Sequence, residues 1–397
     1  MSIVLSENQE KAITAVINCF NQHKKYAVIS GWAGTGKSTI VKEIVRRLPV
    51  HEESVVFAAF TGKACEVLKR NGNDEVSTLH KLLYKSVLRP DGTYLRKPVT
   101  EIPYRVVVVD ECSMPSLEMI NILNSLPDVF VIYLGDDAQL PPIKKDADNH
   151  LLDNPLVKLT EIFRQEDDSD IIDVATDIRE GRPLKYFKGR DVQIIPKTDL
   201  SDGMLLWADV VICATNKTRH YLNKYIRELK GMSGEIAEGE KVICLHNNWD
   251  KESDPDEYPL INGTIGYISQ IHEDHITFPK YLVGADAANE MPIYTYHFQS
   301  EDNQMYYSVN VDKQQFITEK PFFDGTQVYR ILKNPKWNSQ LPDQMTYGYA
   351  ITCHKAQGSQ WPRVLVYEEG FPYDKEEHKR WLYTAATRAS EKLVIVR

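Results

Sequence analysis

The stretch Gly31-Trp32-Ala33-Gly34-Thr35-Gly36-Lys37-Ser38 lies between an apolar run at residues 26–30 and a run with helical spacing. It matches the pattern G-x-x-x-x-G-K-[ST] in the strand-to-helix context that this pattern requires. Glycine in such a loop lets backbone N–H groups approach a phosphate at the N-terminus of a helix. The stretch therefore predicts a phosphate-binding loop in a parallel α/β sheet.

The loop also predicts which side chains bind a nucleotide and its metal ion. Lys37 would place a positive charge on the β and γ phosphates, and the Ser38 hydroxyl would be a ligand for Mg²⁺. We therefore expect ATP and Mg²⁺ as the bound species. The residues that we expect to contact them from this loop are Gly34, Thr35, Gly36, Lys37, Ser38 and Thr39.

A second motif follows about 70 residues later, where four valines at 106–109 precede Asp110 and Glu111. Asp110 is placed to hold Mg²⁺, directly or through water, and Glu111 to orient or deprotonate an attacking water. Two acids after a strand are often no more than a solvated strand end. Their position after a phosphate loop favours nucleotide hydrolysis over binding alone.

On both sides of these motifs, alternating strand-like and helical runs predict two α/β cores with two insertions. The first core has apolar runs at 26–30, 54–60, 105–109 and 129–134, and the second has patterns at 209–214, 216–230, 362–367 and 376–396. Short strands and frequent turns predict a mostly β insertion within the second core, between its runs at 216–230 and 362–367. The expected boundaries are 1–84 and 105–165 for the first core, 85–104 for a hairpin, 166–239 and 346–397 for the second core, and 240–345 for the β insertion.

Composition narrows the class of protein. The 397 residues suggest two to three domains at roughly 150 residues each, and the net charge of −9 excludes a protein that wraps nucleic acid by bulk positive charge. Apolar runs are far shorter than the roughly 20 residues of a membrane span. No basic and apolar leader opens the sequence, and the six cysteines form no C-x-x-C pair. We expect a soluble, cytoplasmic protein.

Four further segments carry a family resemblance. They are 132–142 (IYLGDDAQLPP), 159–165 (LTEIFRQ), 346–359 (TYGYAITCHKAQGS) and 382–389 (LYTAATRA). In this order they resemble motifs III to VI of superfamily 1 DNA helicases, closest to the RecD/Dda-like branch, which translocates 5′ to 3′. In the β insertion, only residues 262–266 (NGTIG) resemble the SH3-like domain of that family.

The resemblance implies two RecA-like cores and further groups at the nucleotide. Arg164 and Arg388 match the positions of arginine fingers, which supply counter-charge to the γ-phosphate as hydrolysis proceeds. Gln139 would contact the γ-phosphate. Gln9 would read the edge of the base, although a capping box with Ser6 alone also explains that residue.

The resemblance also implies a path for nucleic acid along both cores. Hydroxyl, amide and imidazole groups would hold the backbone of a single strand without reading its sequence. Lys217 is a further candidate, and His80 alone equally fits a histidine packed against a helix. The expected contacts are Thr61, Lys63, Thr78, His80, Asn216, Thr352, His354 and Lys355.

The predicted hairpin carries a local excess of positive charge, because residues 77–97 hold five Lys or Arg and one acid. By analogy with the family it would split the duplex, with Tyr94 or Leu95 as the wedge. An aromatic residue near a hairpin tip can equally pack across the strands. Aromatic side chains of the β insertion could stack on bases or form its core, and they are Trp249, Tyr258, Tyr267, Tyr281, Tyr294 and Tyr296.

These observations together predict an ATP-dependent DNA helicase that moves along single-stranded DNA, from 5′ to 3′ by resemblance. Two alternatives stay open. One is a translocase that displaces proteins without unwinding, and the other is a binding subunit switched by ATP. We expect single-stranded DNA and single-strand/double-strand junctions as partners, and a monomer working with replication or recombination proteins in a bacterial or phage context.

Overall fold

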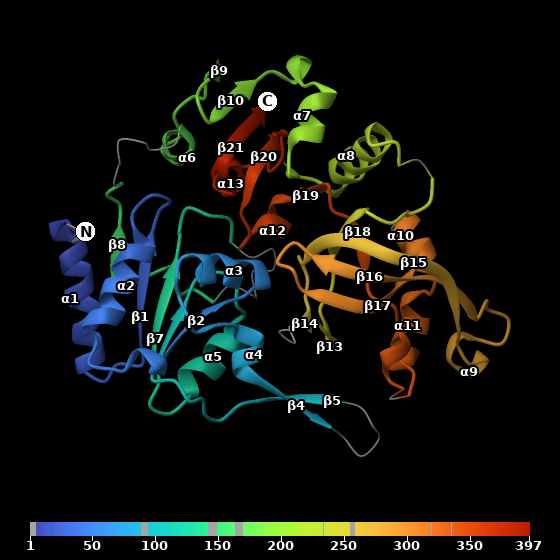
Figure 1. Ribbon diagram of the computed structural model, residues 1–397, viewed down its shortest axis with the longest axis horizontal. Coiled ribbons are helices and arrows are strands. Elements are labelled where there is room, and N and C mark those ends of the chain that lie inside the picture. Colours follow the sequence, from blue (N-terminus) through green and yellow to red (C-terminus); the bar gives the residue numbers. More distant parts are fainter. Residues whose placement is uncertain are drawn as a thin grey trace. The chain divides into compact units, whose positions relative to one another are not determined.

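The computed structural model describes residues 5–88, 94–141, 149–162, 170–232, 234–254, 259–318, 320–334 and 336–397. The chain, which Figure 1 shows as a ribbon, forms two compact units. The first comprises residues 1–85, 98–219 and 351–397, and the second comprises 86–97 and 220–350.

The first unit contains a six-stranded sheet in which every described strand pair is parallel. The strand order is β3-β2-β6-β7-β1-β8. Its strands are β1 (Tyr26–Gly31), β2 (Val55–Ala59), β3 (Val76–Thr78), β6 (Val106–Val109), β7 (Phe130–Gly135) and β8 (Val157–Leu159). The helices that accompany it are α1 (Glu7–Asn21), α2 (Lys37–Arg47), α3 (Gly62–Arg70), α4 (Leu79–Leu83) and α5 (Leu117–Ser125).

The four valines of β6 explain why this strand reads as one continuous apolar run. Val106 and Val108 point to the face covered by α1 and α2, whereas Val107 and Val109 point to the face covered by α4 and α5. All four are fully buried. A parallel strand with helices on both faces has no polar side, so alternation is absent from its sequence.

A second six-stranded sheet in the same unit has the order β19-β11-β20-β21-β10-β9, with β9 antiparallel to β10. The pairs β11–β20, β20–β21 and β10–β21 are parallel. The strands are β9 (Phe187–Lys188), β10 (Val192–Ile195), β11 (Val210–Cys213), β19 (Ala350–Thr352), β20 (Trp361–Tyr367) and β21 (Ala389–Val396). The helices are α6 (Asp170–Arg179), α7 (Asp202–Trp207), α12 (Cys353–Ala356) and α13 (Lys375–Ala386). Helix α8 (Asn216–Leu229) begins in this unit and continues into the second.

The second unit is built on an antiparallel sheet with the order β17-β16-β15-β12-β18. Its strands are β12 (Lys241–Cys244), β15 (Ile265–Thr277), β16 (Glu290–Ser300), β17 (Met305–Asp312) and β18 (Met345–Tyr347), and β13 (Asn248–Glu252) pairs with β14 (Pro259–Leu260). The described part also holds helices, which the sequence pattern did not predict. They are α9 (Lys280–Val283), α10 (Lys313–Thr318) and α11 (Gly325–Leu332).

The aromatic residues of this insertion divide between interior and surface. Tyr294 and Tyr296 are buried in the core of the sheet, whereas Tyr267 and Tyr281 are exposed. The side chain of Trp249 and all of Tyr258 lie outside the described residues. The buried pair therefore belongs to the core, and base stacking by the exposed pair stays a prediction.

The predicted hairpin region contains β4 (Tyr84–Leu88) and β5 (Tyr94–Pro98), which form a two-stranded sheet. Residues 89–93 and the side chains of Tyr94 and Leu95 lie outside the described residues, so the predicted wedge stays a prediction.

Among the helices of the described ranges, none has the length and apolar character needed to cross a membrane. None of the six cysteines forms a disulfide, and all six are buried.

Candidate active site

The candidate site lies at the carboxyl ends of the first sheet. Because β1, β6 and β7 are parallel, the segments that follow them meet at one edge, where α/β proteins bind ligands. A cavity of about 460 Å³ opens there. Its lining includes residues 32–39, Asp110, Glu111, Asp136 and Gln139 from the first core, and Gly358, Gln360, Thr387 and Arg388 from the second.

The phosphate loop has the shape that its sequence predicts. Gly34 and Gly36 have φ values of 78° and 75°, in the left-handed region that glycine adopts without strain. The Lys37 ammonium donates to the carbonyl oxygens of Gly31 at 2.5 Å and Trp32 at 3.1 Å. An ammonium has three N–H donors, so one is left for a phosphate.

The two acids after β6 face the same cavity. Asp110 Oδ1 accepts a hydrogen bond from the Glu111 N–H at 2.9 Å. Burial, and then the negative charge of Glu111, raises the pKa of Asp110, while the positive charge of Lys37 opposes that rise. A buried carboxylate of this kind is stabilised by a nearby cation.

Mg²⁺ fits these residues. The Ser38 hydroxyl and the Asp110 carboxylate line one cavity, and both are oxygen ligands of the kind that Mg²⁺ takes. Among the described residues, no group of three or more His, Cys, Asp and Glu side chains could hold a metal. A site with few protein ligands, completed by water and substrate phosphates, is typical of Mg²⁺.

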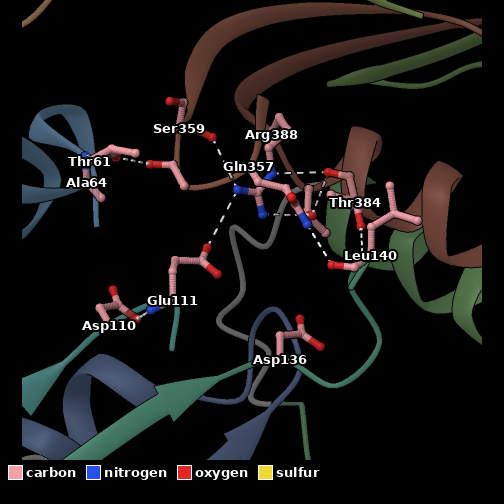
Figure 2. Close-up of polar contacts among 12 residues, drawn as sticks. Thr61, Ala64, Asp110, Glu111, Asp136, Leu140, Gln357, Ser359, Thr384 and Arg388 are labelled. Atoms are coloured by element: carbon pink, nitrogen blue, oxygen red, sulfur yellow. Dashed lines mark hydrogen bonds and ion pairs between the residues drawn. The ribbon is translucent and has the colours of Figure 1, made fainter. Parts of the chain in front are cut away.

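Arg388 brings a positive charge from the second core to this cavity (Figure 2). Its side chain is only 2% exposed. The guanidinium donates to the carbonyl oxygens of Thr384 at 3.1 Å and Ser359 at 3.3 Å, and Nη1 lies 3.6 Å from Glu111 Oε1. Arg164, the other expected finger, lies outside the described residues.

The segment that carries Gln139 is held by two side chains of the second core. Thr384 Oγ1 accepts a hydrogen bond from the Leu140 N–H at 2.8 Å, and Gln357 Nε2 donates to the Leu140 carbonyl at 2.6 Å (Figure 2). These bonds fix the backbone beside Gln139, whose side chain is half-buried in the cavity wall. A movement of either partner would therefore shift Gln139.

Gln9 lies at a different cavity, of about 420 Å³, which residues 156–161 also line. Its capping box with Ser6 is confirmed, because the Ser6 N–H donates to Gln9 Oε1 at 3.0 Å and Ser6 Oγ accepts from the Gln9 N–H at 3.3 Å. The cap uses Oε1 and leaves the amide N–H groups of Gln9 for another acceptor. Its contact with a base stays a prediction.

The expected DNA contacts of the first core are engaged within the protein. Thr61 caps α3 and donates to the Gly358 carbonyl at 3.2 Å, and Thr78 caps α4. The His80 ring packs against Phe60 with centroids 5.1 Å apart. These three side chains are buried, and that of Lys63 lies outside the described residues. Their roles in DNA binding stay predictions.

The expected contacts of the second core are more open. Asn216 is exposed at the first residue of α8, and Thr352, His354 and Lys355 are half-buried around α12. Burial lowers the pKa of His354, so its imidazole is neutral at pH 7 and can donate a hydrogen bond without charge.

Glu369 is a residue that sequence reasoning missed. Its carboxylate accepts hydrogen bonds from the N–H groups of Ala214 at 2.7 Å and Thr215 at 3.1 Å, just before α8. Two of the amides just before this helix are therefore bonded to a side chain of the protein. No sequence signal predicts the pairing, because the partners are about 150 residues apart.

The fold and the cavity define a phosphate-loop nucleotide-binding protein with two parallel α/β cores. The family models agree, since residues 4–193 match an AAA domain and residues 347–396 match a UvrD-like helicase C-terminal domain. The chain belongs to the superfamily 1 helicases of the RecD/Pif1/Dda family.

Two curated relatives illustrate the similarity. The ATP-dependent DNA helicase dda of Enterobacteria phage T4 is 30% identical over 252 residues, which cover 56% of this chain and 57% of the relative. The ATP-dependent RecD2 DNA helicase of Deinococcus radiodurans is 26% identical over 416 residues, covering 98% of this chain and 48% of the relative. The chain thus spans about half the length of these two relatives.

Solved structures share the fold. A Pif1 helicase from Bacteroides, in complex with ADP-AlF3 and single-stranded DNA, has a TM-score of 0.50 and 18% identity, covering 99% of this chain and 92% of that one. A second Pif1 structure, of forked duplex DNA unwinding by two coordinating helicases, also has a TM-score of 0.50, with 17% identity and coverage of 100% and 92%.

Proposed function

We propose that this chain is an ATP-dependent DNA helicase that moves along single-stranded DNA from 5′ to 3′ and unwinds duplex. The observation that carries the proposal is the single cavity in which Lys37, Glu111 and Arg388 meet, two from the first core and one from the second. The relatives named above carry the same activity in their names. The direction rests on resemblance to the RecD/Dda-like branch.

The cavity supports hydrolysis of the γ-phosphate. Lys37 and the amides of the loop would bind the phosphates, and Ser38 and Asp110 would hold Mg²⁺, which neutralises charge on the phosphates when bound. Glu111 would orient water and accept its proton as the water oxygen bonds to the γ-phosphorus. The bond to the β–γ bridging oxygen then breaks, releasing ADP and phosphate, with charge stabilised by Arg388 and Gln139.

Both cores would hold the strand by its backbone. Asn216 is exposed, and Thr352, His354 and Lys355 are half-buried; the four side chains carry amide, hydroxyl, imidazole and ammonium groups. Such donors bind any sequence, as a motor that passes every base requires. We assign strand separation to the hairpin of β4 and β5, and an SH3-like role to the β insertion, by the same family resemblance.

Strand displacement with tailed duplexes tests the proposal. With ATP and Mg²⁺, a duplex with a 5′ single-stranded tail is unwound, whereas blunt and 3′-tailed duplexes are not. Unwinding confined to the 3′-tailed substrate contradicts the direction. ATP turnover that single-stranded DNA stimulates, without displacement of either duplex, identifies instead a translocase that does not unwind.

A separate measurement addresses the binding-subunit alternative. The proposal requires that single-stranded DNA raise the rate of ATP hydrolysis, because the cores close on the nucleotide as they hold the strand. Slow turnover that DNA does not change contradicts a motor and favours a subunit switched by ATP.

A further inference from the structure

Two successive residues of the phosphate loop contact the second core, and the next residue lies beside it. The guanidinium carbon of Arg179 lies 3.7 Å from the ring centroid of Trp32. The N–H of the next residue, Ala33, donates to the Tyr383 hydroxyl at 3.0 Å. A Cβ added to Gly34 would lie 3.3 Å from two side-chain carbons of Ile172.

These contacts come from one wall of the second core. Ile172 and Arg179 lie on α6, Tyr383 lies on α13, and the two helices pack against each other. We call Ile172, Arg179 and Tyr383 the loop clamp. Arg179 and Tyr383 contact Trp32 and Ala33, whereas the nucleotide is expected at Gly34 to Thr39, so these two clamp residues and the nucleotide can engage the loop at once.

Tyr383 makes the most specific contact of the clamp. Its side chain is 1% exposed. Its hydroxyl accepts from the Ala33 N–H and donates to Asp136 Oδ2 at 2.7 Å, while Asp136 Oδ1 accepts from the Ala138 N–H at 3.0 Å. One phenol thus joins the phosphate loop to the segment that leads to Gln139.

We propose that Tyr383 is a positioning residue, which holds the front of the phosphate loop in the shape that binds ATP and so makes nucleotide affinity depend on the second core. The proposal rests on the function proposed above. A hydroxyl bonded on both sides in a buried site is costly to lose, because its removal leaves the amide of Ala33 and one oxygen of Asp136 without their partner.

Tyr383→Phe tests this directly, since it removes the hydroxyl and keeps the ring. The KM for ATP is expected to rise about tenfold, with kcat at saturating ATP and DNA changed less than about threefold. The Kd of a non-hydrolysable ATP analogue should rise by the same factor. Unchanged KM and Kd overturn the proposal, and so does a fall in kcat alone, which would place Tyr383 in the chemical step.

A matched control exists in the first core. Tyr133 is also fully buried, and its hydroxyl donates to Asn124 Oδ1 at 2.9 Å, away from the loop. Tyr133→Phe should leave KM for ATP unchanged, even where it lowers the melting temperature. Equal increases of KM in both variants would mean that general loosening of the fold is the cause, which contradicts the proposal.

A double-mutant cycle separates positioning from packing. Asp136→Asn weakens the same bridge, so it should raise KM clearly in the parent chain and add little in the Tyr383→Phe background. If the two substitutions raise KM additively, Tyr383 and Asp136 do not act through their shared hydrogen bond, which contradicts the proposal. The parent chain shows which proposal fails, because absence of ATP hydrolysis there refutes the proposed function, whereas hydrolysis with unaltered variant constants refutes the clamp alone.

Discussion

Glu111 has a backbone φ of 49°, in a region that non-glycine residues rarely adopt. The residue follows the fully buried β6, and its own N–H is bonded to Asp110. Non-glycine residues in this conformation cluster at functional sites, where the surrounding structure over-determines them. The backbone conformation therefore supports the proposed role of Glu111 independently of its side-chain chemistry.

Lys37→Ala should abolish ATP hydrolysis, with a fall in kcat of about 100-fold or more, because no other charge of the loop replaces the ammonium at the phosphates. Binding of single-stranded DNA should persist. Lys42→Ala is the control, since Lys42 is exposed on the same helix. Turnover by the Lys37 variant at the parental rate, in a coupled ATPase assay, would show that the site is wrongly assigned.

Arg388→Lys keeps the positive charge but loses the planar donors that bond Thr384 and Ser359. We expect hydrolysis to fall by about 100-fold or more with little change in the Kd of an ATP analogue, because the finger acts on charge that develops during the reaction. Arg380→Lys, exposed on α13, should be neutral. A loss of analogue binding equal to the loss of rate contradicts this role.

At the scale of elements, the hairpin has a boundary that its sequence does not reveal. The Val99 N–H donates to the Leu83 carbonyl at 2.9 Å, and the Val99 side chain is buried with that of Leu83 in the first core. Ile102 packs against the same cluster. A deletion of the predicted hairpin, residues 85–104, would therefore remove part of the core as well.

Replacing residues 86–97 with a short Asn-Gly turn should abolish unwinding of a 5′-tailed duplex and leave DNA-stimulated ATP hydrolysis within about threefold of the parent. A deletion that extends to residue 103 should also lower the melting temperature, because it exposes the cluster around Val99. Unwinding by the shorter variant at the parental rate would exclude the hairpin from strand separation.

Local patterns predicted the elements well and the contacts poorly. The run at 106–109 is β6, and the helix expected at 216–230 is α8, because each depends on the periodicity of neighbouring residues. The bond between Ala33 and Tyr383 joins residues 350 positions apart, and no spacing predicts it. The burial of Thr61 was equally invisible, since its partner Gly358 comes from the second core.

At the scale of the whole molecule, the net charge of −9 constrains how DNA is held. The basic residues proposed on the path are few, namely Lys63, Lys217 and Lys355, and His354 is neutral at pH 7 because burial lowers its pKa. Most of the proposed contacts to the DNA backbone then come from uncharged hydrogen-bond donors. Such binding suits a motor that must release the strand at every step.

The affinity for single-stranded DNA should therefore depend weakly on salt. About three ion pairs, at a slope of roughly −0.7 each, predict a slope near −2 in a plot of log K against log salt concentration. Fluorescence anisotropy with a labelled oligonucleotide, between about 50 and about 300 mM salt, measures this slope. A slope steeper than about −4 would mean a larger basic surface than we propose.

The order of strands in the second sheet also governs how the chain folds as it is synthesised. The first sheet draws all its strands from residues 26–159, so it can close early. β11, at Val210–Cys213, lies between β19 and β20, which follow some 140 residues later. The nascent chain must carry this apolar strand without β19 and β20 while residues 220–350 emerge, which makes β11 a point where chaperones would act on the growing chain.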